Sequence, residues 1–142
     1  MKPDARLIIE ASYTARRNKD DEAFRRCFHH DIVFTFNADP DREGSGQRLE
    51  GIAESFAHLK RVAAHWELLQ HVPGPILGDG MVFTRNIQFK MRHRATGQIL
   101  EGKKRHVITV LDDKIASVAE FLDRDLIHAI QRFETPEKPA ND

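Results

Sequence analysis

The sequence predicts a single α+β domain in which helices pack on one face of a strongly curved antiparallel sheet. Apolar residues recur at helical spacing in the N-terminal half of the chain and at every second position through much of the C-terminal half. Short turns rich in glycine and aspartate separate the C-terminal segments. The length of 142 residues suits one hydrophobic core and is too short for two full domains.

Three helices are predicted in the N-terminal half. The first begins at Pro3 and Asp4, and its apolar face is formed by Leu7, Ile8, Ala11 and Ala15. Asp20 or Asp21 caps a short second helix, whose buried face is formed by Ala23, Phe24, Cys27 and Phe28. A strand over residues 32–36 and a polar loop over residues 37–47 lead to a third helix over residues 51–64.

The C-terminal half is predicted to be a series of strands followed by one short helix. The strands cover residues 65–72, 81–94, 99–111 and 114–122, and the helix covers residues 124–133. Residues 134–142 contain two prolines and no apolar cluster, which predicts an unstructured tail. The predicted domain therefore spans residues 1–133.

The turns between the late strands allow a prediction of which residues face each other. A turn centred on Thr96 and Gly97 pairs Arg85 with Ile108 and Ile87 with His106. This register separates a mostly apolar face from a mostly polar one, and a slip by one residue would destroy that contrast.

The next turn, centred on Asp112 and Asp113, adds the last strand to this sheet. It places Ala119 opposite His106, Ser117 opposite Ile108, and Phe121 and Asp123 on the inner face. Glu120 then faces Arg105 on the outer face, as a cross-strand ion pair.

An apolar concavity with a few inward polar groups is the usual form of a small-molecule site. The polar candidates are Arg85, His106 and Asp123, with Tyr13 closing the site from the first helix and Lys104 near its rim. The candidate apolar contacts are Phe36, Trp66, Phe83, Ile87, Phe89, Met91, Ile108 and Phe121.

Each polar candidate also has a purely structural interpretation. Arg85 can pair with an acid at the mouth, and His106 can be a hydrogen-bonded core histidine. Asp123 precedes the last helix, where an N-cap is expected. Tyr13 is either a packing residue or a hydroxyl donor into the site. Trp66 alternates with Leu68 and suits the core.

Composition excludes several classes of function. Lys plus Arg and Asp plus Glu both number 22, so the net charge is zero and a nucleic-acid partner is not expected. One cysteine excludes an internal disulfide, and the eight histidines match no common metal-ligand spacing. No signal segment or membrane span is apparent, so we expect a cytoplasmic protein without metal or membrane contact.

Several segments resemble the NTF2-like superfamily, in particular its SnoaL-like and ketosteroid-isomerase-like branch. The resemblance runs from about Arg6 to Phe133. The segments that carry it are Tyr13-x-x-x-x-Asn18-Lys19-Asp20-Asp21, Ala23-Phe24, Phe28-His29-His30-Asp31, Leu49-Glu50-Gly51-Ile52, Asp113-Lys114-Ile115 and Glu120-Phe121-Leu122-Asp123. Each segment alone is weak, and their order and spacing are specific to the fold rather than to an activity.

The resemblance implies a cone-shaped, cystatin-like barrel with a deep apolar pocket and no metal or organic cofactor. It also implies a homodimer through the outer sheet face, including Asn86, Gln88, Val107 and Val118. Relatives isomerise, cyclise, dehydrate or hydrolyse small hydrophobic molecules, and others only bind.

The resemblance also suggests roles for single residues. Tyr13 matches the tyrosine that donates to the enolate oxygen in the steroid isomerases, and Asp123 matches a strand-end aspartate that some relatives use in catalysis. At the position of the isomerases' general base the chain has Phe36 or Asn37, and Asp39 fits only with a shift of one to three residues. Steroid isomerisation by the mechanism of the family is therefore not expected.

Three functions remain open from the sequence. The first is a cofactor-independent enzyme in which His106 or Asp123 transfers protons and Tyr13 and Arg85 stabilise negative charge. The second is a binding module with the same pocket and no turnover. The third is a protein-interaction scaffold that uses the polar outer face of the sheet.

Overall fold

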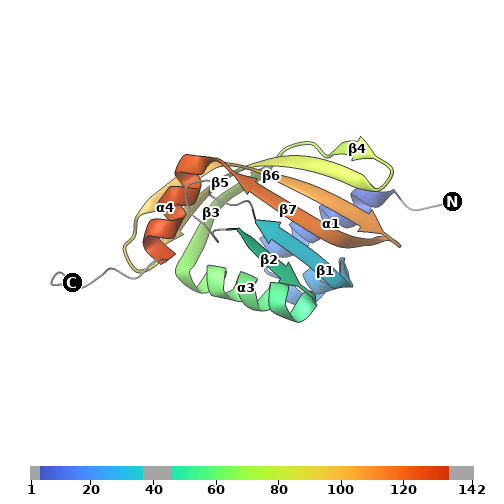
Figure 1. The fold of residues 1–142 in the computed structure, drawn as a ribbon, viewed down its shortest axis with the longest axis horizontal. Coiled ribbons are helices and arrows are strands. Elements are labelled where there is room, and N and C mark those ends of the chain that lie inside the picture. Colours follow the sequence, from blue (N-terminus) through green and yellow to red (C-terminus); the bar gives the residue numbers. More distant parts are fainter. Residues whose placement is uncertain (1–3, 37–45, 135–142) are drawn as a thin grey trace.

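The computed structural model describes residues 4–36 and 46–134. In this part of the chain the helices are α1 (Ala5–Arg17), α2 (Asp21–Arg26), α3 (Ile52–His65) and α4 (Arg124–Glu134). The strands are β1 (Phe28–Phe36), β2 (Gln47–Glu50), β3 (Trp66–Pro73), β4 (Leu77–Asp79), β5 (Val82–His93), β6 (Ile99–Leu111) and β7 (Lys114–Leu122). The predicted α+β class is confirmed (Figure 1). Pro3, residues 37–45 of the predicted loop and residues 135–142 of the predicted tail lie outside the described residues.

The first two helices begin at side-chain caps. The carboxylate of Asp4 accepts a hydrogen bond of 3.0 Å from the backbone N–H of Arg6, and that of Asp20 accepts one of 3.1 Å from Ala23. Asp20, rather than Asp21, is therefore the cap of α2. Arg16 and Arg17 lie in the last turn of α1, where cations favour the negative end of the helix dipole.

The sheet is mainly antiparallel, as predicted, and one pair of its strands in the described residues is parallel. The strand order is β2-β1-β7-β6-β5-β3, with β4 paired to β5. β1 runs parallel to β7, with Phe34 opposite Val118. Most of the chain separates these two strands, so no short turn forces them to be antiparallel. Phe28 starts β1 instead of ending α2.

Two short strands have no counterpart in the prediction. β2 has four residues and β4 has three. Segments of this length show too few alternations for a period of two to be recognised. Both are positioned by their neighbours, β2 by β1 and β4 by β5.

The register of β5 against β6 differs by two residues from the predicted one. Arg85 lies opposite His106, and the last pair before the turn is Arg92 with Ile99. The connection is longer than a two-residue turn, because the backbone N–H of Gly97 bonds the carbonyl of His93 at 2.8 Å. A shift by an even number preserves the faces, so Arg85 and His106 stay on the inner face.

The register of β6 against β7 shifts by one residue at a β-bulge. The tight turn at Asp112 and Asp113 has φ of 52° and 60°, and Val110 pairs with Ile115 as predicted. Beyond the bulge Thr109 pairs with Ser117, and an odd shift exchanges the two faces.

Several predictions for β7 are therefore wrong. His106 lies opposite Glu120 instead of Ala119, and Ile108 opposite Val118 instead of Ser117. Glu120 is on the inner face and does not pair with Arg105 across the outer one. Val118 is buried and cannot belong to an outer dimer surface.

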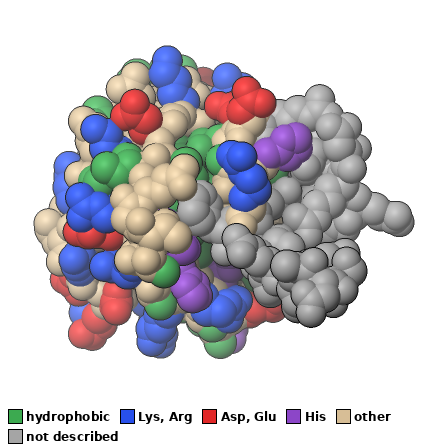
Figure 2. Space-filling view, turned by 90° about the vertical axis from the view of Figure 1, so that its left-hand side faces the viewer, with side chains coloured by type: hydrophobic (Ala, Val, Ile, Leu, Met, Phe, Trp, Pro, Cys, Tyr) green, Lys and Arg blue, Asp and Glu red, His purple; other side chains and the backbone are tan. Residues whose placement is uncertain are grey.

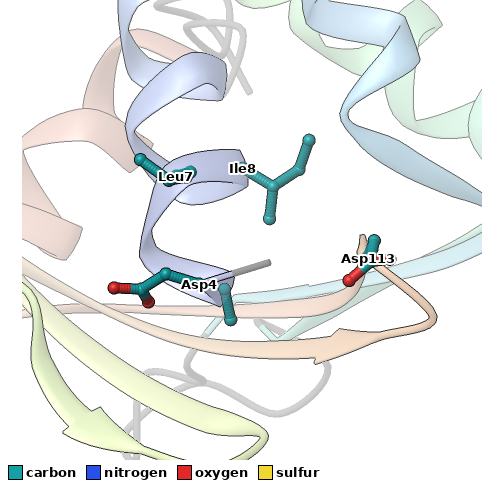
Figure 3. A pocket seen from close by; sticks show the side chains of 5 residues that line it. Asp4, Leu7, Ile8 and Asp113 are labelled. Carbon is teal, nitrogen blue, oxygen red and sulfur yellow. The ribbon is translucent and has the colours of Figure 1, made fainter. Parts of the chain in front are cut away.

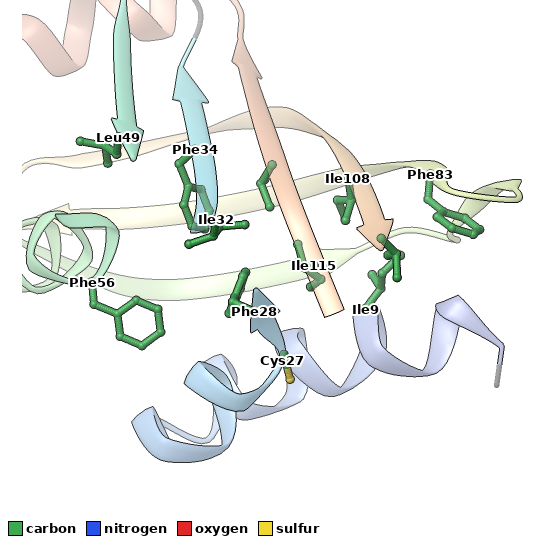
Figure 4. Close-up of a cluster of buried hydrophobic side chains, with 12 residues drawn as sticks. Ile9, Cys27, Phe28, Ile32, Phe34, Leu49, Phe56, Phe83, Ile108 and Ile115 are labelled. Atoms are coloured by element: carbon green, nitrogen blue, oxygen red, sulfur yellow. The ribbon is translucent and has the colours of Figure 1, made fainter. Parts of the chain in front are cut away.

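The hydrophobic core lies between the inner face of the sheet and the helices (Figures 1 and 4). Its members come from α1, the C-cap of α2, α3 and five strands: Ile9, Cys27, Phe28, Ile32, Phe34, Leu49, Phe56, Phe83, Ile108, Val110, Ile115 and Val118. Burial of Cys27 confirms its place in the core. Within the described residues, no helix is long and apolar enough to cross a membrane.

The helix α4 packs at the end of the sheet away from the N-terminus of α1 (Figure 1). Leu126 occupies the space above Gly102 of β6, since a Cβ atom there would lie 2.9 Å from a Leu126 methyl group. Leu126, Ile127 and Ala129 are buried. The absence of a side chain at Gly102 thus lets the helix approach the strand.

Replacement of Gly78 by alanine is expected to destabilise the β4–β5 hairpin. Gly78 has φ of +115°, and a Cβ atom would lie 2.6 Å from the carbonyl oxygen of Val82. We expect Gly78→Ala to lower the free energy of unfolding by about 2–3 kcal/mol. At Gly80, where φ is +70° and no atom lies within 4 Å, alanine should cost only about 1 kcal/mol. Urea unfolding measures both, and equal losses would contradict the assigned clash.

Candidate functional site

Three neighbouring strands place their functional side chains in one row across the inner face. Arg85 of β5 is paired in register with His106 of β6, which is paired with Glu120 of β7. Tyr13 of α1 contacts this row through its hydroxyl, which is hydrogen-bonded to His106. The prediction that Arg85 and His106 point toward the helices is confirmed, since both contact α1.

A continuous chain of hydrogen bonds links the helix to the last strand. The Tyr13 hydroxyl lies 2.5 Å from Nδ1 of His106, and Nε2 of His106 lies 2.9 Å from Oε1 of Glu120. Nζ of Lys104 lies 3.4 Å from the same carboxylate oxygen. The His106 and Glu120 side chains are 14% and 18% exposed, so this chain is largely shielded from water.

Electrostatics determines the protonation states along this chain. Burial lowers the pKa of His106, although the hydrogen bond to Glu120 opposes the shift. Burial alone would raise the pKa of Glu120, but the Lys104 ammonium and the His106 N–H hold it well below its usual range. Burial also raises the pKa of Tyr13, against the opposing charge of Arg85. The phenol and the imidazole are thus neutral at pH 7, and the carboxylate is ionised.

These states fix the tautomer of the histidine. An ionised carboxylate only accepts hydrogen bonds, so Nε2 of His106 carries the proton and donates it to Glu120. Nδ1 then has a free lone pair and accepts from the Tyr13 hydroxyl. The donors all point in one direction, from Tyr13 through His106 to Glu120.

Arg85 packs against the ring of Tyr13. Its Nε donates to the carbonyl of Gly74 at 2.7 Å and its Nη2 to Glu10 of α1 at 2.8 Å. The guanidinium carbon lies 4.5 Å from the centroid of the Tyr13 ring, a cation–π contact. The Arg85 side chain is only 6% exposed, and a buried cation requires an acidic partner. Glu10 is this partner, as the sequence predicts for an acid near Arg85.

Two further basic side chains lie around the same centre. The ring of His71 from β3 stacks on Tyr13 with centroids 5.9 Å apart. Burial and the charge of Lys104 lower the pKa of His71 to about 4. His58 of α3 lies against Phe36, with ring centroids 5.1 Å apart, and burial together with Arg61 lowers its pKa. Both imidazoles are neutral at pH 7.

Asp123 has the capping role that its position before the last helix predicts. Its carboxylate accepts a 2.9 Å hydrogen bond from the backbone N–H of Leu126, so it is the N-cap of α4. Phe121 lies opposite Arg105 on the outer face and is 46% exposed, so it cannot form an inner wall. The bulge in β7 is the reason that Phe121 faces outward.

The apolar candidates divide into two groups. Phe83 and Ile108 pack with Ile9 in the core beneath α1. Ile87, Phe89 and Trp66 are buried, while Phe36 and Met91 are half-buried. Contact of these residues with a substrate stays a prediction. Asn37 and Asp39, the other candidates near the end of the first strand, lie outside the described residues.

Sequence reasoning missed four members of the site: Glu120, Glu10, His71 and His58. For Glu10 a signal exists, because it precedes Tyr13 by three residues and so shares its side of α1. For His71 the inward orientation depends on an irregular register of β3 against β5, and for Glu120 on the bulge in β7.

One hollow on the described surface lies apart from these residues. A shallow hollow of about 210 Å³ at the start of α1 is lined by Asp4, Ala5, Leu7, Ile8 and Asp113, none of them a predicted site residue (Figure 3). Among the residues that the structure describes, no three His, Cys, Asp or Glu side chains gather to hold a metal ion. On the face in Figure 2, acidic and basic side chains are intermixed over the described surface.

The arrangement of helices and sheet is similar to that of several solved structures. An NTF2-like protein from Burkholderia thailandensis has a TM-score of 0.78 at 18% identity, covering 95% of this chain and 100% of its own. A proposed polyketide cyclase from Pseudomonas putida has a TM-score of 0.70 at 18% identity, covering 87% and 95%. TerC, crystallised with polyporic acid, has a TM-score of 0.74 at 20% identity, covering 90% and 98%.

These likenesses define the fold as NTF2-like. The sequence itself matches the SnoaL-like domain over residues 9–118, which is most of its length. The chain therefore belongs to the SnoaL-like domain family, as its sequence resemblance indicates. No curated protein matches the chain.

The charge of Lys104 is expected to act measurably on His71. In an NMR titration the His71 ring should titrate near pH 4, and Lys104→Gln should raise this pKa, because it removes the largest opposing charge. Lys103→Gln changes a lysine that faces away from the site and should leave it unchanged. A His71 pKa near 6.5 in the unaltered protein would contradict the described burial.

The lowered pKa of His71 also predicts how the stability of the protein changes with pH. Below about pH 6.5 the unfolded chain protonates His71, while the folded protein does not until about pH 4. This residue therefore lowers the free energy of unfolding as the pH falls through that range.

Proposed function

We propose that this protein is an enzyme that moves a proton on a small apolar substrate without a cofactor. The observation that carries the proposal is the oriented hydrogen-bond chain from Tyr13 through His106 to Glu120. A buried, neutral imidazole held by a carboxylate is a suitable general base near neutral pH. The role assigned to Asp123 from the sequence passes to Glu120.

The proposed step is a proton relay through the tyrosine. A substrate C–H or O–H gives its proton to the Tyr13 oxygen, while the Tyr13 hydroxyl proton passes to Nδ1 of His106. The bonding electrons of the broken C–H or O–H bond stay on the substrate, and the imidazolium is stabilised by Glu120. The reverse transfer returns the proton to a different substrate atom, which completes an isomerisation, a cyclisation or the loss of a leaving group.

The surrounding residues favour this transfer. The guanidinium of Arg85, 4.5 Å from the Tyr13 ring centroid, stabilises negative charge that develops on the phenol oxygen. Lys104 keeps Glu120 ionised, so the carboxylate can stabilise the imidazolium. Together they lower the cost of separating charge in a site with little water.

The substrate class is proposed from the site and from related proteins. A carbonyl or hydroxyl group would provide the acidic proton, and Ile87, Phe89 and Met91 on the same face offer apolar contacts. Family membership and the likeness to the Pseudomonas putida protein support a small organic substrate. TerC, which shares the fold, was crystallised with a small organic compound, polyporic acid.

Replacement of His106 by glutamine tests the proposal. Exchange of the acidic C–H protons of 2-tetralone for deuterium in D₂O, followed by NMR, measures proton transfer without knowledge of the substrate. We expect His106→Gln to slow exchange by about 100-fold and Glu120→Gln by about 10-fold or more. The control Glu101→Gln removes an exposed carboxylate paired with Lys90 on the outer face and should not affect the rate.

The result also separates catalysis from binding. If the unaltered protein binds 2-tetralone and catalyses no exchange, the proposed activity is wrong and the chain is a binding module. If His106→Gln exchanges at the unaltered rate, the relay is wrong.

We also propose that the protein forms a homodimer through the outer face of the sheet, which carries Asn86, Gln88 and Val107. Phe121, which the bulge turns outward, adds apolar surface to this face. Phe121→Glu is expected to yield a monomer in solution scattering at micromolar concentration, because it buries a charge at the interface. The control Leu7→Glu changes a more exposed apolar residue on α1. A monomer without any substitution would contradict the proposal.

A further inference from the structure

The guanidinium of Arg16 is a cation near the proposed relay, and it has no hydrogen bond or ion pair among the residues that the structure describes. Arg16 follows Tyr13 by three residues in α1, so both side chains leave the same side of the helix. It is half-buried, and its guanidinium carbon lies 5.9 Å from the centroid of the Phe24 ring. Five donor hydrogens in this position would normally have an acceptor.

The charge of Arg16 reaches the centre of the site. It acts on His71 and His106, whose pKa values it lowers, and on His58 of α3. Glu120 and Asp21 in turn act on Arg16, and neither forms an ion pair with it. The Arg16 side chain is half-buried, and this burial lowers the pKa of the guanidinium.

The two cations closest to Tyr13 and Glu120 have ion-pair partners among the described residues. Lys104 pairs with Glu120, and Arg85 pairs with Glu10. The nearby imidazoles are neutral at pH 7, because burial lowers the pKa of each. Arg16, in contrast, has no ion-pair partner among the described residues, although it is half-buried. An anionic group on a ligand would compensate its positive charge.

We infer that the substrate is a small apolar acid whose carboxylate binds Arg16 while its reacting atom lies at Tyr13. A guanidinium presents two parallel N–H donors that match the two oxygens of a carboxylate. The helical rise from residue 13 to residue 16 is about 4.5 Å, which suits a carboxylate a few bonds away from the reacting atom. The inference rests on the proposed function only for the reacting atom, since binding to Arg16 does not require turnover.

A matched pair of ligands tests the charge requirement directly. The probes are 2-naphthoate and 2-naphthamide, which share ring and shape and differ in charge at pH 7.5. Isothermal titration calorimetry should show naphthoate binding about 10-fold more tightly, as expected for a hydrogen-bonded ion pair. Equal affinities, or no binding of either probe, would overturn the inference.

Variants of two adjacent arginines assign the preference to a residue. Arg16→Gln should remove the preference for naphthoate and leave the affinity for naphthamide unchanged, which also shows that the fold is intact. Arg16→Lys should retain part of the preference, because it keeps the charge. Arg17→Gln removes an exposed charge from the same helical turn and should keep the preference. A preference that survives in Arg16→Gln would show that another residue binds the anion.

The two proposals fail separately. Loss of deuterium exchange in the unaltered protein, with the naphthoate preference intact, removes the catalytic proposal and leaves an anion-binding site at Arg16. Exchange that depends on His106, with no preference for naphthoate, leaves the relay and removes the inference about the acid.

Discussion

The β-bulge at Ala116 governs the chemistry of the inner face. Val110 pairs with Ile115 and Thr109 with Ser117, so Ala116 lies between two consecutive pairs as an extra residue of β7. Because side chains alternate along a strand, one extra residue exchanges the faces of everything beyond it. Glu120 thereby comes under α1, within hydrogen-bonding distance of His106. The bulge converts a buried histidine into one member of an oriented relay.

A carboxylate in this position is costly unless donors and cations surround it. Glu120 receives both, from the His106 N–H and from the Lys104 ammonium. The same burial that would neutralise the acid keeps the imidazole neutral, so His106 is free to accept a proton at pH 7. In the His106–Glu120 pair the negative charge thus lies on Glu120, the member farther from Tyr13. This charge favours the transfer of a proton from Tyr13 to His106.

The helix α1 connects the core to the site. Its buried residues Ile9 and Ala15 anchor it to the protein interior. Glu10, Tyr13 and Arg16 follow each other at intervals of three along a neighbouring side of the helix. Glu10 binds Arg85 and Tyr13 binds His106, while the guanidinium of Arg16 has no hydrogen bond among the described residues. Burial of Ile9 and Ala15 therefore fixes the positions from which Glu10, Tyr13 and Arg16 extend.

The sequence by itself determined the helices, the long strands and the faces of β5 and β6, because these follow from local periodicity. Tyr13, Arg85 and His106 were identified for that reason, and an error of two residues in register did no harm. The tertiary structure decided the features that do not appear in the local periodicity of the sequence. The parallel pairing of β1 with β7 joins segments far apart in the chain, and the bulge inserts one residue into a regular pattern. Glu120 took the place of Asp123 through that single residue, because alternation along a strand carries one local irregularity to every position after it.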